Sequence, residues 1–269
     1  MGMKVNLMNI SANDTIRDIL EHKSMLRSLV IKNLIGRYKN SYFGLLWHFI
    51  TPSIMMLVYY VVFTEIRTST LDNFWLYLAS GLFPFHFMLN NLSNGSSCII
   101  DNAGIIKKMY IPKMILVLSQ VISTFIVMLI GYLMVIVGML LLCIHMTIYI
   151  ALVPVIMGLM FIFVVGYVSF FSAVTVYARD LIYFINSINM VFFFMTPMYF
   201  LTSNVTGLLS IFVWVNPFTY YVEMFHYLVY WGAPPSMQVC IGCIILPILT
   251  ILLGCTVFRK LSPRFAEKM

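Results

Sequence analysis

Long uncharged apolar runs dominate the pattern of this chain. Six of them contain no Lys, Arg, Asp or Glu, and they cover residues 44–64, 74–97, 114–142, 149–177, 181–201 and 238–258. A helix needs about 20 apolar residues to cross a hydrocarbon core of about 30 Å. A Lys, Arg or Asp at the centre of such a helix costs about 2.5–3.5 kcal/mol. The pattern therefore predicts an all-α integral membrane protein with six transmembrane helices.

The basic residues predict how these helices are oriented. Every Lys and Arg except Arg67 lies before the first run, between the second and third, after the fourth or after the sixth. Because basic residues in short loops are retained on the cytoplasmic side, we expect a multi-pass protein of the cytoplasmic (inner) membrane with both termini in the cytoplasm. The net charge of +7 then reflects topology, and no nucleic-acid-binding motif accompanies it.

One further apolar stretch, residues 207–231, carries Glu223 as its only formal charge. As a seventh span it would place the basic end of the chain outside the cell, against the charge pattern. Asn216-Pro217 also divides it into two pieces that are too short to cross. We expect two re-entrant or interfacial helices on the outer side. They should border a pathway, because irregular backbone at membrane depth needs protein or a watery cavity around it.

Composition excludes a water-soluble fold. Hydrophobic residues make up 62% of the chain and charged residues only 9%, whereas soluble domains carry about 25% charged residues. We expect a single membrane domain over residues 1–269. It divides into a cytoplasmic amphipathic N-terminal segment (1–42), a six-span region (44–258) and a cytoplasmic tail (259–269). The N-terminus lacks the apolar run and cleavage site of a signal peptide, so the spans themselves should direct insertion.

The N-terminal segment contains a different pattern. In residues 14–38, apolar side chains recur near helical spacing with basic residues between them. This pattern predicts an amphipathic helix that lies in the membrane interface. A short soluble helix packed on the cytoplasmic loops fits the same pattern, and the sequence leaves both interpretations open.

The sequence offers no motif for catalysis or metal binding. It lacks G-x-x-x-x-G-K-[ST], H-E-x-x-H and paired intramembrane carboxylates. Cys240 and Cys243 form a C-x-x-C inside an apolar run, where small core residues are the simpler interpretation. His48 and His86 lie inside the runs, and we expect them to be hydrogen-bonded at helix interfaces rather than to relay protons. The chain therefore borrows energy from a partner or forms a passive pore.

The loop after the second run favours a borrowed energy source. Residues 101–112 mix apolar and basic side chains in a helix-sized piece that ends at Pro112. Such a piece is suited to docking into a cleft on a cytoplasmic protein. The alternative is a loop whose lysines serve only to fix the topology.

Short motifs in a fixed order carry a family resemblance over nearly the whole chain. They are R-Y-x-x-S-x-x-G-x-x-W-x-x-x-x-P from Arg37 to Pro52, Gly81-Leu82-Phe83-Pro84, Ile105-Ile106-Lys107-Lys108 with Pro112, Arg179-Asp180, Thr196-Pro197-x-Tyr199, Asn216-Pro217 and Arg264-Phe265. Together they resemble the ABC-2-type permeases that export polysaccharides, including O-antigen, capsule and teichoic acid. Phe85-His86-Phe87 departs from the family pattern, in which tryptophan is common at this place.

The resemblance implies a transport subunit without enzymatic activity. The chain would form a homodimer of six-span subunits bound to two copies of a separate ABC ATPase, which holds the ATP and Mg, while this chain holds no cofactor or metal. A lipid-linked polysaccharide would move from the cytoplasmic to the outer face of the lipid membrane. Segment 14–38 matches the interface or gate helix of the family, and 207–231 matches its external re-entrant helices. The region that couples to the ATPase falls on Asn102, Ile105, Ile106, Lys107, Lys108, Met109 and Tyr110.

Aromatic residues, 16% of the chain, suggest how a sugar polymer is handled. Flat amphipathic rings contact the apolar faces of sugars without binding them tightly, so rings in the outer halves of spans one and five are expected to line the conduit. Lipid-facing belts of Tyr and Trp are the alternative. Arg37, Lys107 and Lys108 are candidates for guiding a diphosphate headgroup. The candidate lining residues are Tyr59, Tyr60, Phe63, Phe192, Phe193, Tyr199 and Phe200.

Two other functions remain to be separated from polysaccharide export. One is an ABC-2-type exporter of a drug or a simple lipid, and the other is a self-contained membrane pore or scaffold. Binding of an ABC ATPase distinguishes both exporters from the pore, and the transported molecule distinguishes the exporters from each other.

Overall fold

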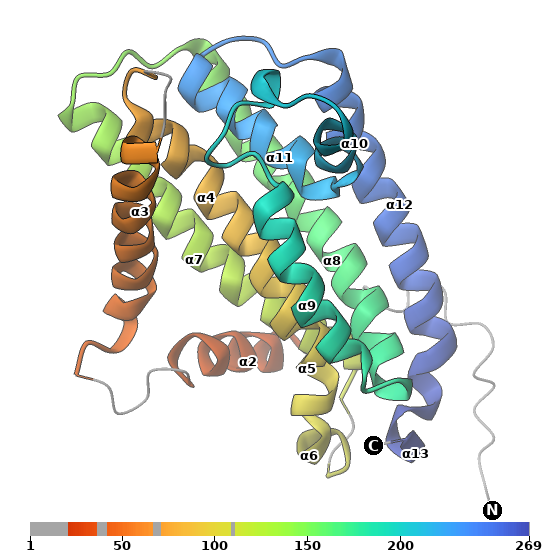
Figure 1. Ribbon diagram of the computed structural model, residues 1–269. Coiled ribbons are helices and arrows are strands. Elements are labelled where there is room, and N and C mark those ends of the chain that lie inside the picture. Colours follow the sequence, from red (N-terminus) through yellow and green to blue (C-terminus); the bar gives the residue numbers. More distant parts are fainter. Residues whose placement is uncertain (1–20, 37–41, 67–70, 109–110, 269) are drawn as a thin grey trace, which may run out of the picture.

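The computed structural model describes residues 21–36, 42–66, 71–108 and 111–268, and all regular secondary structure in these residues is helical. Tall helices stand side by side, and shorter elements gather at both ends (Figure 1). The tall helices are α3 (Trp47–Ile66), α4 (Phe74–Asn90), α7 (Lys113–Leu141), α8 (Val153–Tyr177), α9 (Leu181–Met195) and α12 (Met237–Leu261). The shorter ones are α2 (Lys23–Gly36), α5 (Ser96–Asp101), α6 (Ala103–Ile106), α10 (Leu208–Val215), α11 (Pro217–Phe225) and α13 (Phe265–Lys268).

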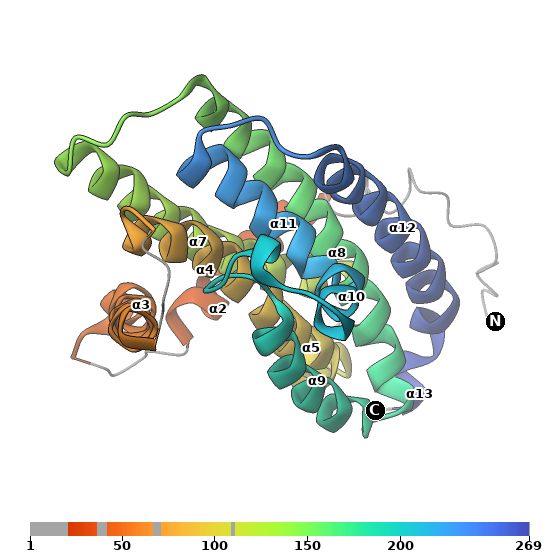
Figure 2. The same cartoon turned by 45° about the horizontal axis from the view of Figure 1, so that its top comes forward.

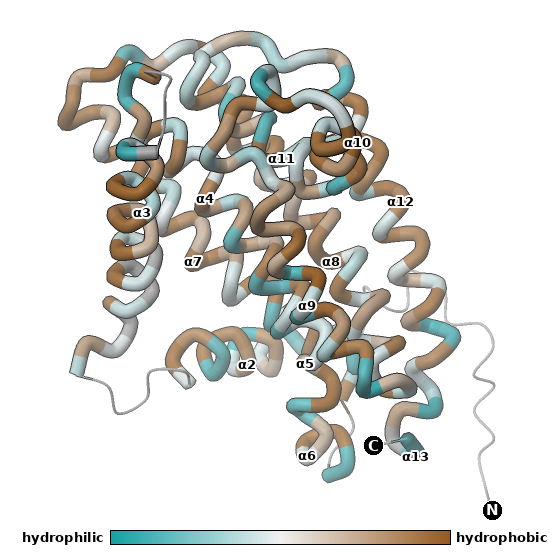
Figure 3. Tube along the Cα trace, in the orientation of Figure 1, coloured by the Kyte–Doolittle hydropathy of each residue, from teal (hydrophilic) through white to brown (hydrophobic). Residues whose placement is uncertain are grey.

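The all-helical prediction is confirmed, and three of the predicted spans are helices long and apolar enough to cross a membrane. In the described residues they are Lys113–Leu141, Ile148–Tyr177 and Met237–Arg264. Two shorter apolar stretches, Ser53–Glu65 and Leu181–Met195, belong to α3 and α9. Figure 3 shows that hydrophobic positions predominate along the tall helices, and large apolar residues on them such as Leu133, Val155 and Leu252 are exposed, as expected for elements that meet lipid.

The second predicted span is helical from α4 through α5 but contains a π-helical turn, Asn91–Gly95. Such a turn is a short i→i+5 interruption of an α-helix. The carbonyls of Phe87 and Met88 just before it accept a hydrogen bond from the Asn91 backbone N–H, and polar side chains add further hydrogen bonds to both. The Asn91 amide donates to the carbonyl of Phe87 at 2.8 Å, and the Tyr167 hydroxyl donates to that of Met88 at 2.6 Å. The turn is therefore built into this helix by its own polar residues and by α8.

The fifth predicted span is shorter than its apolar run. The run predicts a helix over 181–201, but α9 ends at Met195, and Thr196 has extended backbone angles. The cause is Pro197, because proline disfavours helical conformation in the residue before it. Tyr77 satisfies the freed backbone by donating its hydroxyl to the carbonyls of Pro197 at 3.2 Å and Phe200 at 2.7 Å.

The stretch 207–231 is divided at Asn216-Pro217, as predicted. α10 precedes this point and α11 follows it, continued by a π-helical turn, His226–Trp231. Asn216 caps α11, since its side-chain oxygen accepts a hydrogen bond from the Phe218 N–H at 3.0 Å. Proline at the first helical position needs no hydrogen bond for its nitrogen. α11 packs between α4 and α12 (Figure 2).

The closest helix pair of the bundle is α8 with α12. Gly166 and Gly254 face each other across it, and a Cβ atom on Gly254 would lie 2.1 Å from the Gly166 carbonyl oxygen. Small residues allow helix backbones to approach in this way, and they favour packing in membranes, where hydrophobic attraction between helices is weak. The Thr250 hydroxyl adds a hydrogen bond to the Phe163 carbonyl at 3.2 Å.

α2 lies across the lower end of the bundle, nearly perpendicular to the tall helices (Figure 1). It packs on α7, with Leu29 and Val30 buried, while Ile31 and Ile35 on its other side are 44% and 46% exposed. The packing on α7 agrees with the second interpretation left open by the sequence, and the exposed isoleucines give α2 a second apolar face, the kind that an interfacial helix uses. Of the predicted segment 14–38, residues 14–20 and 37–38 lie outside the described part.

Every described Lys and Arg lies at this same lower end, on α2, in the α5–α7 and α8–α9 connections, at the start of α7 or at the end of α12 and beyond it (Figure 1). The C-terminal segment folds back there. Phe265 is fully buried, the Lys113 ammonium lies 5.3 Å from its ring centre, and the Tyr177 hydroxyl donates to the Leu261 carbonyl at 2.9 Å. The predicted grouping of basic charge at one face agrees with this arrangement.

Candidate functional site

The predicted coupling region forms the tip of the lower end, where α6 projects below the tall helices (Figure 1). Lys107 and Lys108 are exposed, Ile105 is half-buried, and Ile106 packs against the core. Asn102 fixes the base of the loop by donating its amide to the Cys98 carbonyl at 2.7 Å. The exposed surface therefore combines apolar and basic groups on a short, supported helix. Met109 and Tyr110 lie outside the described residues.

The coupling region is also joined to α2. The Lys32 ammonium donates to the Asn102 side-chain oxygen at 3.0 Å, and the Asn33 amide of α2 donates to the Ser119 hydroxyl of α7 at 3.4 Å. These two hydrogen bonds join α2 to the α6 loop and to α7. Of the candidates for headgroup guidance, Lys107 and Lys108 are exposed at this end, and Arg37 lies outside the described residues.

Four of the predicted lining aromatics form one cluster between α3 and the C-terminal end of α9 with the residues that follow it. The rings of Phe63 and Tyr199 stack with centroids 4.4 Å apart, and Phe193 lies 5.8 Å from Tyr59 and 6.1 Å from Tyr199. All four side chains are partly exposed. We call these residues, Tyr59, Phe63, Phe193 and Tyr199, the aromatic cluster. It joins the first and fifth predicted spans, which are distant in the sequence.

Of the other three predicted aromatics, one adjoins the aromatic cluster and two point elsewhere. Phe200 adjoins the cluster, with its ring centre 5.2 Å from that of Tyr199. Tyr60 turns toward Phe74 at 6.2 Å, and Phe192 packs inward against Phe218 at 5.0 Å. These two rings are therefore separated from the aromatic cluster although they neighbour its members in sequence.

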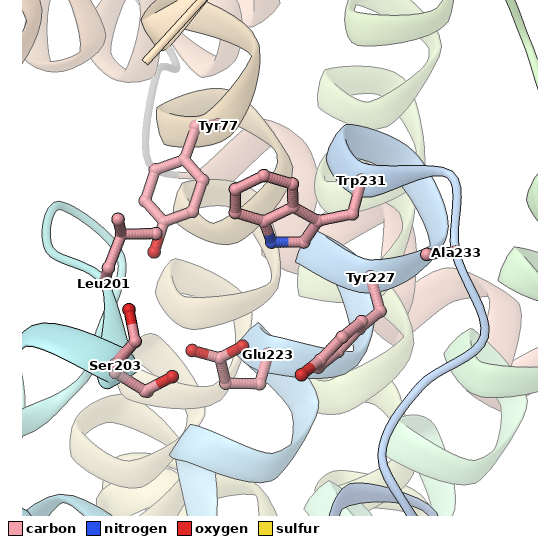
Figure 4. Close-up of a pocket in the computed structure, with 8 residues that line it drawn as sticks. Tyr77, Leu201, Ser203, Glu223, Tyr227, Trp231 and Ala233 are labelled. Atoms are coloured by element: carbon pink, nitrogen blue, oxygen red, sulfur yellow. The ribbon is translucent and has the colours of Figure 1, made fainter. Parts of the chain in front are cut away.

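A pocket of about 370 Å³ opens at the upper end, beside residues 223–233. Glu223 of α11 points into it and is only 5% exposed, and Thr202 and Ser203 line the same space. Figure 4 shows the side chains of Tyr77, Tyr227 and Trp231 around the same space. Aromatic faces beside hydroxyl and carboxyl groups suit an amphipathic ligand. Sequence reasoning missed this pocket, although a lone acid in an apolar stretch was its signal.

The remaining candidate groups show no reactive arrangement. Cys243 is buried, and its thiol donates to the Tyr220 carbonyl at 3.4 Å; the described cysteines are free thiols. No group of three His, Cys, Asp or Glu side chains that could hold a metal occurs in the described residues. His86 is half-buried against the Phe85 ring, and its Nε2 has no hydrogen-bond partner among the described residues. The predicted hydrogen bond of His86 is thus missing, and the His48 side chain lies outside the described part.

Comparison of the sequence with known proteins identifies its family. The sequence model of the ABC-2 type transporter family matches residues 25–230. The chain is similar to the O-antigen export system permease protein RfbA of Myxococcus xanthus, with 24% identity over 94% of this chain and 98% of the relative. Two RfbA proteins of Klebsiella pneumoniae are 29% and 27% identical, each over 88% of this chain and 91% of the relative. The chain therefore belongs to the ABC-2 type transporter family, as a membrane permease.

Proposed function

We propose that this permease forms half of the channel of an ATP-driven exporter of lipid-linked polysaccharide. Two copies, each with six spans and cytoplasmic termini, would assemble with two ABC ATPase subunits in the cytoplasmic membrane. ATP and Mg would be bound by the ATPase. The polymer would enter at the lower end of Figure 1 and leave beside the re-entrant segment.

The observation that carries this proposal is the similarity over nearly the full length to permeases named for O-antigen export. The geometry supports it in two places. The α6 tip offers a docking surface at the end where the described basic residues gather. The aromatic cluster and the pocket at Glu223 offer weak, repeated contacts for a sugar chain at the opposite end.

A second copy is supported by the side of the molecule that carries α3 and α9. α3 stands at the edge of the bundle (Figure 2). On α9, Ile185 is the one buried residue, whereas Tyr183, Phe184 and Met190 are 75%, 60% and 66% exposed. Helices with so little burial of their own gain packing partners when two subunits meet. A channel between the copies would then be bordered by the aromatic cluster.

Co-expression with the ABC ATPase encoded nearest to this chain tests the proposal. We expect a complex of two permeases and two ATPases, measured by light scattering after affinity purification through the permease. Reconstituted vesicles should then move lipid-linked polymer only when ATP is present. Absence of any bound ATPase would favour the passive pore, and ATP-driven movement of a drug or simple lipid alone would favour the general exporter.

The aromatic cluster gives a prediction within this function. We expect Tyr59→Ala combined with Tyr199→Ala to slow polymer export about three- to tenfold, because an aromatic contact contributes about 0.5–1.5 kcal/mol. Export in ATPase-containing vesicles is the measurement. Leu252→Ala is the control, since Leu252 is an exposed residue of α12, away from α3 and α9. Unchanged export in the double variant would show that these rings do not line the conduit.

A further inference from the structure

A line of polar side chains runs along one face of the α4–α5 helix. It contains His86, Asn90, Ser93, Asn94, Ser97 and Asp101, and we call it the polar stripe. The steps of three or four residues match the helical repeat, which places these side chains on one face. The π-helical turn lies within the stripe and sets the angle between its upper and lower parts. Such turns are frequent at functional sites.

The polar stripe is open to its surroundings at the depth of the membrane. Asn90 and Asp101 are exposed, and Ser93, Asn94 and Ser97 are partly exposed. Asn90 lies 11 residues above Asp101, or about 16 Å at 1.5 Å per residue, which is well inside a hydrocarbon core that begins near the lower helix ends. In both views, this part of the helix lies between α3 and α9 (Figures 1 and 2).

α9 adds amides to the same surface. The Ser93 hydroxyl donates to the side-chain oxygen of Asn186 at 2.8 Å, and the amide of Asn189 donates to the Ser93 hydroxyl. Asn186 is exposed, and the side-chain oxygen of Asn189 has no partner among the described residues. Figure 3 shows hydrophilic positions interrupting α9 at this level. Two helices therefore face each other through amide and hydroxyl groups.

Contact with lipid would be unfavourable for this surface. Within the described part of the chain, no residue bonds the side-chain amides of Asn90 and Asn94. An amide left without a hydrogen-bond partner in an apolar environment costs about 1–3 kcal/mol, and the polar stripe carries several such groups. Polar residues within spans accordingly face the bundle interior or a water-filled cavity. The polar stripe needs water or a hydrogen-bonding ligand beside it.

The charged groups near the polar stripe favour a neutral ligand over an anionic one. α4, α5 and α9 contain no Lys or Arg, and the one acidic side chain of the stripe, Asp101, stands at its lower end. Near the stripe, the described basic side chains lie only at the lower tip, where Lys32 bonds Asn102 and Lys107 and Lys108 are exposed. A polyanion would therefore meet no countercharge along the membrane part of the stripe. Hydroxyl groups are both donors and acceptors, as amides and hydroxyls of the protein are. A neutral hydroxyl-bearing chain therefore fits, and a phosphate-rich chain does not.

We propose that the polar stripe lines the inner, water-filled half of the conduit and hydrogen-bonds an uncharged, hydroxyl-bearing segment of the transported polymer. This inference rests on the proposed export function. It continues the aromatic cluster downward, because Phe85, beside His86, lies 6.1 Å from Phe193. The conduit thus has an amide and hydroxyl inner half below an aromatic outer half.

Cysteine accessibility tests the proposal without knowledge of the polymer. Asn94→Cys and Asn186→Cys are introduced separately, and Leu252→Cys, at an exposed position of α12, is the control for a lipid-facing site. Inside-out vesicles that contain the ATPase complex are treated with a membrane-impermeant cationic methanethiosulfonate, and the modified peptide is quantified by mass spectrometry. We expect both stripe thiols to react at least about tenfold faster than the control thiol, since the reactive thiolate forms in water and not in lipid.

The charge preference is measured by comparing the cationic reagent with an anionic one, each normalised to its rate with a free thiol in solution. We expect the normalised reaction rate of the cationic reagent to equal or exceed that of the anionic reagent. Preference for the anion would overturn the neutral-polymer class. Slow reaction at both stripe positions, or oxidative cross-linking of two Asn94→Cys subunits, would overturn the water-filled lining. Because ATPase binding is read separately in the same vesicles, failure of the polar stripe is distinguishable from failure of the export function.

Discussion

Gly254→Val is expected to destabilise the folded permease strongly. The new side chain would begin 2.1 Å from the Gly166 carbonyl oxygen, and both partners are backbone atoms of long helices that have no room to shift locally. Overpacking of this kind costs about 1–3 kcal/mol or more. We expect the melting temperature in detergent to fall by about 5–10 °C, measured by size-exclusion chromatography after heating.

Gly158→Val is the matched control for this substitution. Gly158 lies on α8, as Gly166 does, but a Cβ atom there would meet nothing within 4 Å. Its melting temperature should stay close to that of the wild type, apart from the small cost of a β-branched residue in a helix. Equal melting temperatures for Gly254→Val and the wild type would show that α8 and α12 do not pack through these glycines.

Gly104→Trp is expected to abolish binding of the ATPase while leaving the permease folded. Gly104 is exposed on α6, and a Cβ atom there would meet nothing within 4 Å, so the indole extends outward into the proposed docking surface. A bulky obstruction at the centre of an interface costs well over 1.4 kcal/mol, which corresponds to a loss of affinity of at least about tenfold. Co-purification of the ATPase through the tagged permease measures this loss.

Two controls keep the interpretation of Gly104→Trp specific. The melting temperature of the variant alone should match that of the wild type, since the substitution touches no packed residue. Gly158→Trp places the same side chain on the outward side of α8 and should leave ATPase binding intact. Full co-purification with Gly104→Trp would contradict the assignment of α6 as the docking element.

Much of the fold follows from the sequence because membrane insertion depends on a few strong rules. Charge-free runs predicted the helices, the positions of Lys and Arg predicted which ends lie together, and Asn216-Pro217 predicted the break between α10 and α11. The end of α9 was predicted wrongly, although Pro197 was visible, because apolar character continues to Leu201 beyond the residue where the backbone leaves the helix.

The α6 loop was predictable because it depends on one short segment. The aromatic residues were predicted to gather from their positions in spans one and five, and the ring contact between Tyr59 and Phe193 agrees with this, but the sequence did not predict which rings meet. The polar stripe was missed because the spans were searched for charges, and neutral amides such as Asn90 and Asn94 do not interrupt a charge-free run. The pocket at Glu223 and the contact between Gly166 and Gly254 depend on distant segments, which no local pattern reports.

The early end of α9 has a consequence for the surrounding bilayer. Fifteen helical residues extend about 22 Å, whereas the hydrocarbon core is about 30 Å thick. Lipid would have to thin wherever it met so short a helix directly, at a cost of fractions of a kcal/mol per ångström of mismatch. A second copy packed against α9, as proposed above, removes that cost because it replaces lipid along the helix. The short helix thus favours protein over lipid as the neighbour of α9 within the membrane.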